Sequence, residues 1–164
     1  MKICSFTGHR QIKYSHLGGI AKLVDRAIEY VYSKGCREFI AGGAIGFDTV
    51  AAREVVKFRM THRDVRLLLF LPCLEQDSKW TARQKAQYEY LLSEADEVVY
   101  VSEEYTEGCM KQRNFQLAAK ADVLVAYVSR NNSGAAQTVR MAREKGIEIY
   151  NLYPALEAEA ADQS

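Results

Sequence analysis

The sequence predicts an α/β fold, a Rossmann-like three-layer sandwich with a mainly parallel sheet of about six strands. Three observations predict it. Short apolar runs rich in Val, Ile and Leu alternate with longer stretches of helical periodicity, the pattern of βαβ units. Glycine-bearing loops follow several of the predicted strands. The length of 164 residues is that of one ordinary domain.

The elements follow in order along the chain. Compact apolar runs bounded by polar residues or glycine are predicted as strands: Lys2–Phe6, Glu38–Ala41, Val65–Leu71, Glu97–Val101, Val123–Val128 and Glu148–Leu152. Apolar residues spaced by three and four predict helices: Leu17–Lys34, Phe47–Met60, Thr81–Glu94, Met110–Ala121 and Ala135–Lys145. Gly35 and Gly146 follow the first and last helices as C-caps. Residues 1–156 are expected to form the domain, and 157–164 an acidic helical overhang or frayed tail without a chemical role.

Composition limits the classes of partner. The chain has 22 Lys and Arg against 21 Asp and Glu, and this balance argues against nucleic acid as partner. An anion site must therefore be local. Scattered cysteines and the lack of a signal segment lead us to expect a cytoplasmic location. The longest apolar run, Leu67–Leu71 with its neighbours, is far below the about 20 residues of a membrane span, and no metal or cofactor is predicted.

The first candidate loop is Thr7–Arg10, which follows the first predicted strand. In an open parallel sheet the functional surface lies beyond the carboxyl ends of the strands. A hydroxyl, a glycine, an imidazole and a guanidinium gather here, a set that suits an anion. The alternative has Gly8 as a turn residue and His9 with Arg10 as a solvated exit from the sheet.

The second candidate loop, Ala41–Asp48, leads from a strand into a helix and contains Gly42, Gly43 and Gly46. Free N–H groups at such a helix start can hold a phosphate. The spacing matches neither the dinucleotide fingerprint nor the P-loop, so hydride transfer with a dinucleotide cofactor is unsupported. Asp48 either favours the positive end of the helix dipole or contacts a ribose or catalytic group.

The third loop, Pro72–Trp80, contains Glu75 and the chain's one tryptophan. Trp80 could stack on a base, or it could cover the edge of the core, as large aromatic residues more often do. Cys73 is interpreted as a small residue at the core edge.

The fourth loop enters a helix that carries Lys111, Arg113 and Asn114 in its first turns. Cations oppose the dipole at a helix N-terminus, so an anionic partner explains them better than helix stability does. The alternative is surface charge balanced by nearby glutamates.

The fifth loop, Ser129–Thr138, again joins a strand to a helix through hydroxyls, amides and Gly134. It repeats the anion-site arrangement and would face the same crevice as the second loop. Ordinary N-capping by Ser133 is the competing account.

Five segments together resemble the SLOG superfamily, the Smf/DprA and lonely-guy-like Rossmannoid proteins, and are most similar to its YpsA-like branch: Thr7–Arg10, Gly42–Asp48, Glu75–Trp80, Lys111–Asn114 and Ser133–Thr138. The resemblance implies a Rossmannoid fold, binding of a nucleotide derivative and, often, homo-oligomers. Lonely-guy enzymes hydrolyse the N-glycosidic bond of nucleoside monophosphates through an arginine and a glutamate. Arg113 matches that arginine, whereas Val139–Ala142 stands where the acidic residue would be.

The leading hypothesis is a domain that binds or senses a phosphate-containing nucleotide-type molecule, with Arg10 and Arg113 neutralising charge. An alternative is a phosphoribohydrolase-type N-glycosidase with Arg113, Asp48 and Glu75 as catalytic candidates. A third is a single-strand nucleic-acid module that also uses Lys111 and Arg130. A protein adaptor would leave the glycine and arginine loops unexplained. The candidate ligand-binding residues are Thr7, Gly8, His9, Arg10, Gly42, Gly43, Gly46, Asp48, Trp80, Arg113, Asn114, Ser133, Gly134 and Thr138.

Overall fold

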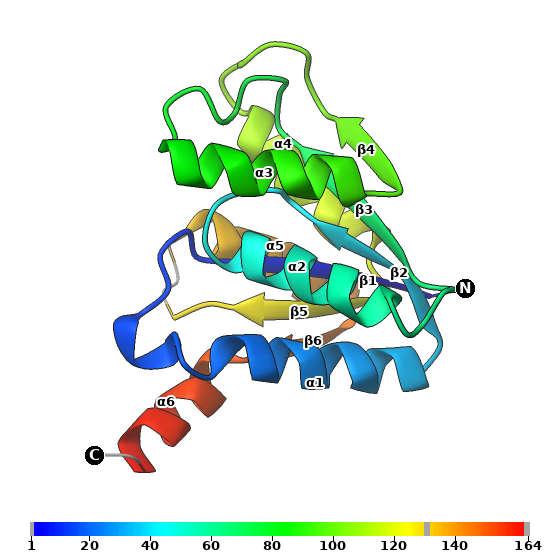
Figure 1. Ribbon diagram of the computed structural model, residues 1–164, viewed down its shortest axis with the longest axis vertical. Helices are drawn as coiled ribbons and strands as arrows, with labels where there is room; N and C mark the ends of the chain where they lie inside the picture. Colours follow the sequence, from blue (N-terminus) through cyan, green and yellow to red (C-terminus); the bar gives the residue numbers. More distant parts are fainter. Residues whose placement is uncertain (1, 130–131, 163–164) are drawn as a thin grey trace.

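The computed structural model describes residues 2–129 and 132–162. One six-stranded sheet in the order β4-β3-β2-β1-β5-β6 forms its centre, and all neighbouring strands are parallel (Figure 1). The strands are β1 Lys2–Gly8, β2 Cys36–Ala41, β3 Arg66–Leu71, β4 Glu97–Tyr100, β5 Val123–Tyr127 and β6 Glu148–Asn151. The predicted α/β fold with six parallel strands is therefore confirmed.

Helices cover both faces of the sheet, which gives the three layers. Helices α1, α2 and α3 lie on one face, and α4 and α5 pack together on the other (Figure 1). The helical elements are η1 Tyr14–His16, α1 Ile20–Ser33, α2 Phe47–Arg59, α3 Ala82–Glu94, α4 Cys109–Lys120, α5 Gly134–Lys145 and α6 Tyr153–Asp162. Within the described residues, no helix is both long and apolar enough to cross a bilayer.

The central strands are apolar on both sides because each side is covered by helices. All residues of β5 and all but the first of β3 are buried. The larger core cluster, with Phe6, Phe39 and Phe47, lies on the face of α1 to α3. A second cluster, with Leu124 and Ala126, packs against α5 on the other face.

Short local signals set the helix ends. The Thr81 hydroxyl accepts a hydrogen bond from Gln84 N at 3.2 Å, and the Gln84 side chain bonds back to Thr81 N, a capping box that starts α3. Gly35 and Gly146 follow α1 and α5 with φ values of 106° and 83°, a left-handed conformation that glycine adopts at low cost. Gly146 is the C-cap of α5 as predicted, whereas the C-cap of α1 is Lys34 and Gly35 follows it.

The strand order reverses between β1 and β5. From β1 the chain adds β2, β3 and β4 on one side, then returns to place β5 and β6 on the other. The loops that leave β1 and β5 therefore diverge and leave a crevice beyond their carboxyl ends, where open α/β sheets bind ligands. This reversal brings the first, second, fourth and fifth loops together.

The C-terminal segment is helical as far as it is described. Helix α6 begins at Tyr153, buries Leu156 and runs to Asp162 without a break at residue 157. It contacts η1, the short turn between β1 and α1. The acidic stretch is thus part of a helix that packs beside the loop after β1.

Candidate functional site

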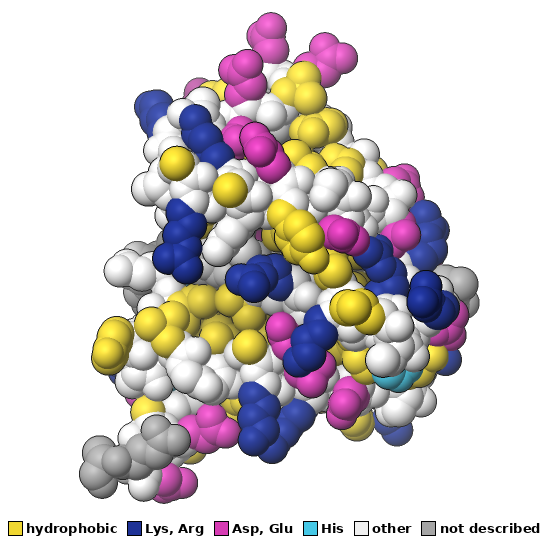
Figure 2. All heavy atoms as spheres, viewed as in Figure 1, with side chains coloured by type: hydrophobic (Ala, Val, Ile, Leu, Met, Phe, Trp, Pro, Cys, Tyr) yellow, Lys and Arg dark blue, Asp and Glu magenta, His cyan; other side chains and the backbone are white. Residues whose placement is uncertain are grey.

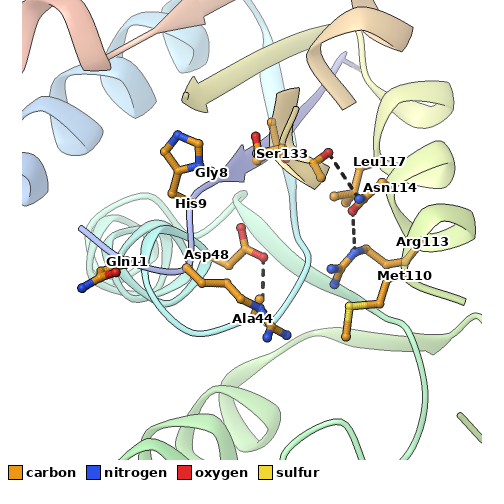
Figure 3. A pocket seen from close by; sticks show the side chains of 14 residues that line it. Gly8, His9, Gln11, Ala44, Asp48, Met110, Arg113, Asn114, Leu117 and Ser133 are labelled. Atoms are coloured by element: carbon orange, nitrogen blue, oxygen red, sulfur yellow. Dashed lines mark hydrogen bonds between the residues drawn. The ribbon is translucent and has the colours of Figure 1, made fainter. Parts of the chain in front are cut away.

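A cavity of about 480 Å³ lies in the crevice at the strand reversal (Figure 3). The end of β1 and the loop after it, the start of α2 with the loop before it, the first three turns of α4 and the start of α5 surround it. Its lining residues are Thr7, Gly8, His9, Arg10, Gln11, Ala44, Asp48, Met110, Arg113, Asn114, Leu117, Ser133, Gly134 and Ala135. Sequence segments far apart in the chain thus build one site.

Backbone contacts fix the loop after β1 on its neighbours. His9 N donates to Tyr127 O at 3.1 Å, and Phe47 N donates to His9 O at 3.1 Å. Gly8 lies against Phe47, because a β-carbon at residue 8 would come within 2.5 Å of its ring. A glycine is therefore required here for close packing rather than for a turn conformation.

The His9 ring is turned toward the end of β5. Its Nε2 accepts a hydrogen bond from Ser129 N at 2.8 Å, and Ser129 Oγ lies 3.1 Å from the same nitrogen. Accepting from an amide requires a free lone pair on Nε2, so the ring is neutral with its proton on Nδ1. His9 therefore joins the loops after β1 and β5, while Arg10 and Gln11 lie exposed on the cavity rim.

The glycine loop before α2 is shaped by close approach. Gly46 has φ +81°, and a β-carbon there would lie 2.2 Å from Arg10 O. Gly43 has φ +70°, and its carbonyl accepts a bond from Gln76 Nε2 at 3.1 Å. Neither glycine lines the cavity. Their conformations place Ala44 and Asp48 on its wall instead.

Arg113 is held from behind. Its Nη1 donates to Gly42 O, and its Nε donates to Asn114 Oδ1 at 2.9 Å. Only 5% of Arg113 is exposed. Figure 3 shows Asp48 and Arg113 reaching into the cavity from opposite sides. The guanidinium is thus fixed in place before any ligand arrives.

Asp48 is buried with one oxygen unused. Its Oδ2 accepts from Ala44 N at 3.2 Å, whereas Oδ1 has no hydrogen-bond partner among the described residues. Burial raises the pKa of Asp48 to about 6, against the opposing effects of Arg113, the Ala44 N–H and Arg10. Burial also lowers the pKa of Arg113, but a guanidinium remains protonated near neutral pH. The cavity therefore combines a fixed cation with a carboxylate that titrates close to neutrality.

The start of α5 is an N-cap and part of the cavity wall at once. Ser133 Oγ accepts from Ala136 N at 3.0 Å, so the competing account of ordinary capping is confirmed. Ser133, Gly134 and Ala135 nevertheless face the cavity. Thr138 is fully buried and donates to Gly134 O at 3.2 Å, which makes it a support of this turn.

The third loop lies apart from the cavity lining. Trp80 packs edge-on against Tyr88, with 5.2 Å between ring centroids, and belongs to the margin of the larger core cluster. Neither Trp80 nor Glu75 is among the residues that line the cavity in the described parts of the chain. Cys73 is buried, as its interpretation as a core-edge residue requires.

Nine residues singled out from the sequence line the cavity: Thr7, Gly8, His9, Arg10, Asp48, Arg113, Asn114, Ser133 and Gly134. Gly42, Gly43, Gly46 and Thr138 support the wall from behind. Lys111 is exposed on α4 outside the lining, and Arg130 lies outside the described residues.

Five lining residues were missed: Gln11, Ala44, Met110, Leu117 and Ala135. Met110 and Leu117 could have been found, because they stand three residues before and four after Arg113 on one helix face. Gln11, Ala44 and Ala135 carry no such signal beyond their neighbours in the chain. Among the described residues, no group of His, Cys, Asp and Glu could hold a metal ion.

The fold and cavity define an open α/β protein of Rossmann-like class with a site at its strand reversal. The chain belongs to the YpsA family, described as the YspA SLOG family, whose sequence profile matches residues 6–153. The resemblance inferred from the loops is thereby confirmed.

Relatives and solved structures agree with this assignment. A UPF0398 protein of Bacillus cereus strain G9842 is 30% identical and covers 99% of this chain and 94% of its own length. A UPF0398 protein of Bacillus thuringiensis strain Al Hakam is 29% identical over 93% of this chain and 89% of its own length.

Two DNA processing proteins A share the fold at low identity. That of Streptococcus pneumoniae superposes with a TM-score of 0.64 at 16% identity, over 91% of this chain and 49% of the other. That of Helicobacter pylori, described for its single-stranded DNA binding mode, gives a TM-score of 0.61 at 16% identity, over 90% and 63%. This chain thus spans about half to two-thirds of those proteins.

Proposed function

We propose that the cavity binds a phosphate-containing nucleotide-type small molecule. The observation that carries this proposal is the buried Arg113 guanidinium, held by Gly42 O and Asn114 in the cavity wall. Among the described residues its Nη2 has no hydrogen-bond partner, so this nitrogen can donate to a ligand. A fixed planar guanidinium in a site of low exposure suits the oxygens of a phosphate.

Other features of the cavity support a phosphate ester rather than a bare anion. Arg10 adds a second cation at the rim, and the N-terminal turn of α5 favours negative charge. Asp48 Oδ1 is an unused acceptor that a sugar hydroxyl would satisfy. Met110 and Leu117 offer an apolar wall to the remainder of the ligand. A volume of about 480 Å³ lies in the range of small-molecule sites.

One observation favours an N-glycosidase as a second candidate. Asp48 is the one carboxylate that lines the cavity in the described parts of the chain, and its pKa of about 6 suits a general acid or base. Asp48 would then act beside a phosphate held by Arg113. Glu75, the other acidic candidate, lies outside the lining.

Single-stranded nucleic acid is the third candidate, favoured by the fold shared with the Helicobacter pylori protein. Charge gives it little support. Lys and Arg side chains are interspersed with Asp and Glu on the face covered by α1 to α3 (Figure 2). An oligonucleotide whose affinity falls steeply with added salt would revive this candidate, because phosphate contacts release counterions.

The experiment is thermal unfolding against inorganic phosphate, nucleoside mono- and diphosphates, ADP-ribose and dinucleotides. A ligand that binds the folded state at a hundredfold excess over its Kd stabilises it by about 2.7 kcal/mol. We expect a selective shift that Arg113→Ala and Arg10→Ala both reduce. Lys111→Ala, an exposed cation on the same helix, is the matched control and should keep the full shift.

Two outcomes separate the candidates. Release of free base from a bound nucleoside monophosphate, lost in Asp48→Asn, would establish the glycosidase. Binding without turnover supports the binding or sensing role. No shift with any phosphate compound would overturn the proposed site.

A further inference from the structure

A chain of hydrogen bonds joins the C-terminal helix to the loop that carries Arg10. Glu157, in the second turn of α6, accepts at Oε1 from both Lys13 Nζ and His16 Nε2, each at 2.7 Å. His16 Nδ1 lies 2.7 Å from the Tyr127 hydroxyl, which also accepts from Lys13 N at 3.1 Å. Three parts of the chain far apart in sequence thus share one polar network.

The acceptor at one end of this network fixes a proton on His16. A carboxylate oxygen only accepts, so His16 Nε2 carries a proton and donates it to Glu157 Oε1. The Tyr127 hydroxyl accepts from Lys13 N and shares a hydrogen bond with His16 Nδ1. His16 is fully buried, so loss of the Glu157 acceptor would leave this N–H unpaired at a cost.

Aromatic packing extends the contact to the cavity. Tyr153, the first residue of α6, lies edge-on to His16 at 4.8 Å and to His9 at 6.4 Å between ring centroids. Tyr127 stacks on Phe47, the first residue of α2, at 5.7 Å. The start of α6 therefore packs on the histidine that lines the cavity as well as on the one that Glu157 binds.

Tyr127 forms two hydrogen bonds with the loop after β1. Its carbonyl accepts from His9 N, and its hydroxyl accepts from Lys13 N. The cavity residues Arg10 and Gln11 lie between these anchors and are themselves exposed. Glu157 supports the second of these contacts, that of Lys13 N with the Tyr127 hydroxyl, because it binds both Lys13 and His16. Hydrogen bonds thus link a carboxylate of α6 to the segment that carries Arg10.

We propose that Glu157 is a positioning residue of the ligand cavity, which acts through His16, Lys13 and Tyr127 to hold Arg10 at the rim. This role rests on the proposed function, since it concerns the same site. Its cause is geometric. A loop that is anchored at both ends holds the Arg10 guanidinium in one position. A loop that is anchored at one end lets the guanidinium occupy many positions, and ordering it on a phosphate then costs conformational entropy and weakens binding.

The test compares Glu157→Ala with Glu159→Ala, which removes the same charge from the same helix. Among the described residues, Glu159 makes no hydrogen bond or ion pair with the loop after β1. We expect Glu157→Ala to speed hydrogen exchange of the amides at 10–16 by about tenfold in the free protein. The Kd for AMP and for ADP-ribose should rise by about five- to tenfold. Glu157→Gln keeps a side-chain oxygen that can accept, so its exchange rates and its Kd values should change less than those of Glu157→Ala. Glu159→Ala should match wild type in both measurements.

A double variant separates positioning from general damage. In an Arg10→Ala background, Glu157→Ala should weaken AMP binding no further, because the residue it positions is gone. An equal further loss there would overturn the proposal, and so would unchanged exchange and affinity in the single variant. Wild-type protein that binds no phosphate compound of the thermal-unfolding panel would overturn the proposed function itself. Unchanged affinity in Glu157→Ala beside a wild type that binds would overturn the positioning role alone.

Discussion

Arg113 and Asp48 meet at Gly42. A β-carbon on Gly42 would lie 2.7 Å from Arg113 Nη1 and 2.8 Å from Asp48 Oδ2, closer than side chains normally approach. The cation and the carboxylate of the cavity therefore converge at the end of β2 only because this position has no side chain. Gly42 contributes to the site by leaving room for the Arg113 and Asp48 side chains.

Gly42→Ala should accordingly damage both the fold and the site. We expect a loss of unfolding free energy of about 2 kcal/mol, since the new methyl group must displace two buried polar side chains. Binding of AMP should weaken in parallel. Urea unfolding measures the first and calorimetric titration the second. Gly18→Ala, with nothing within 4 Å of the added carbon, is the control and should behave like wild type. A Gly42→Ala protein with an unchanged urea midpoint would contradict this account.

The raised pKa of Asp48 predicts a pH-dependent stability difference. Its pKa is about 6 in the folded protein and 3.8 ordinarily, so between these values the native state binds more protons than the unfolded state. The contribution of Asp48 to stability therefore falls as pH rises through this window. Asp48→Asn has no carboxyl to titrate, so its free energy of unfolding does not fall in this way. The difference in unfolding free energy between the variant and wild type should therefore rise by up to about 3 kcal/mol from pH 3.5 to pH 7.

Chemical unfolding of both proteins at several pH values measures this gain. Taking the difference between variant and wild type removes the titrations that the two proteins share. A difference that stays flat across the window would show that Asp48 titrates normally.

The contact between Gly8 and Phe47 predicts coupled substitutions. Gly8→Ala should destabilise by about 1–3 kcal/mol, because a β-carbon would come within 2.5 Å of the Phe47 ring. In a Phe47→Ala background the same substitution should cost less, because Cγ and Cδ2 of Phe47, each 2.5 Å from the added carbon, are gone and only Cβ at 2.6 Å remains. Thermal or urea unfolding of the four proteins gives the coupling energy. Additive losses would mean that the backbone at residue 8 relaxes instead.

Trp80 is expected to stabilise the protein rather than hold the ligand. Its edge-on contact with Tyr88 predicts that Trp80→Leu lowers the unfolding temperature while the Kd for AMP stays within about twofold of wild type. Because Trp80 is the chain's single tryptophan, intrinsic fluorescence reports on it alone. Strong quenching by AMP, with lost affinity in Trp80→Leu, would instead support stacking on a base.

The sequence predicted most of the fold because its signals are local. The continuous apolar runs of β3 and β5 identify strands buried on both faces, and Gly35 and Gly146 mark helix ends by a conformation that favours glycine. Lys111 and Arg113 could be singled out because cations oppose the dipole at a helix start, although only Arg113 lines the cavity. Trp80 shows what the sequence could not decide. A single aromatic residue in a loop is compatible with packing on the core and with stacking on a ligand.

The sequence by itself determined the succession of strands and helices along the chain and the loops that carry polar side chains. It could do so because apolar periodicity, glycines and helix caps act over a few neighbouring residues. Only the tertiary structure decided which loops meet. The return of the chain from β4 to β5 beside β1 brings Arg113 to Asp48 at Gly42 and sets Glu157 against His16. The raised pKa of Asp48 and the anchoring of Arg10 both arise from burial and contacts between distant segments, which no local pattern encodes.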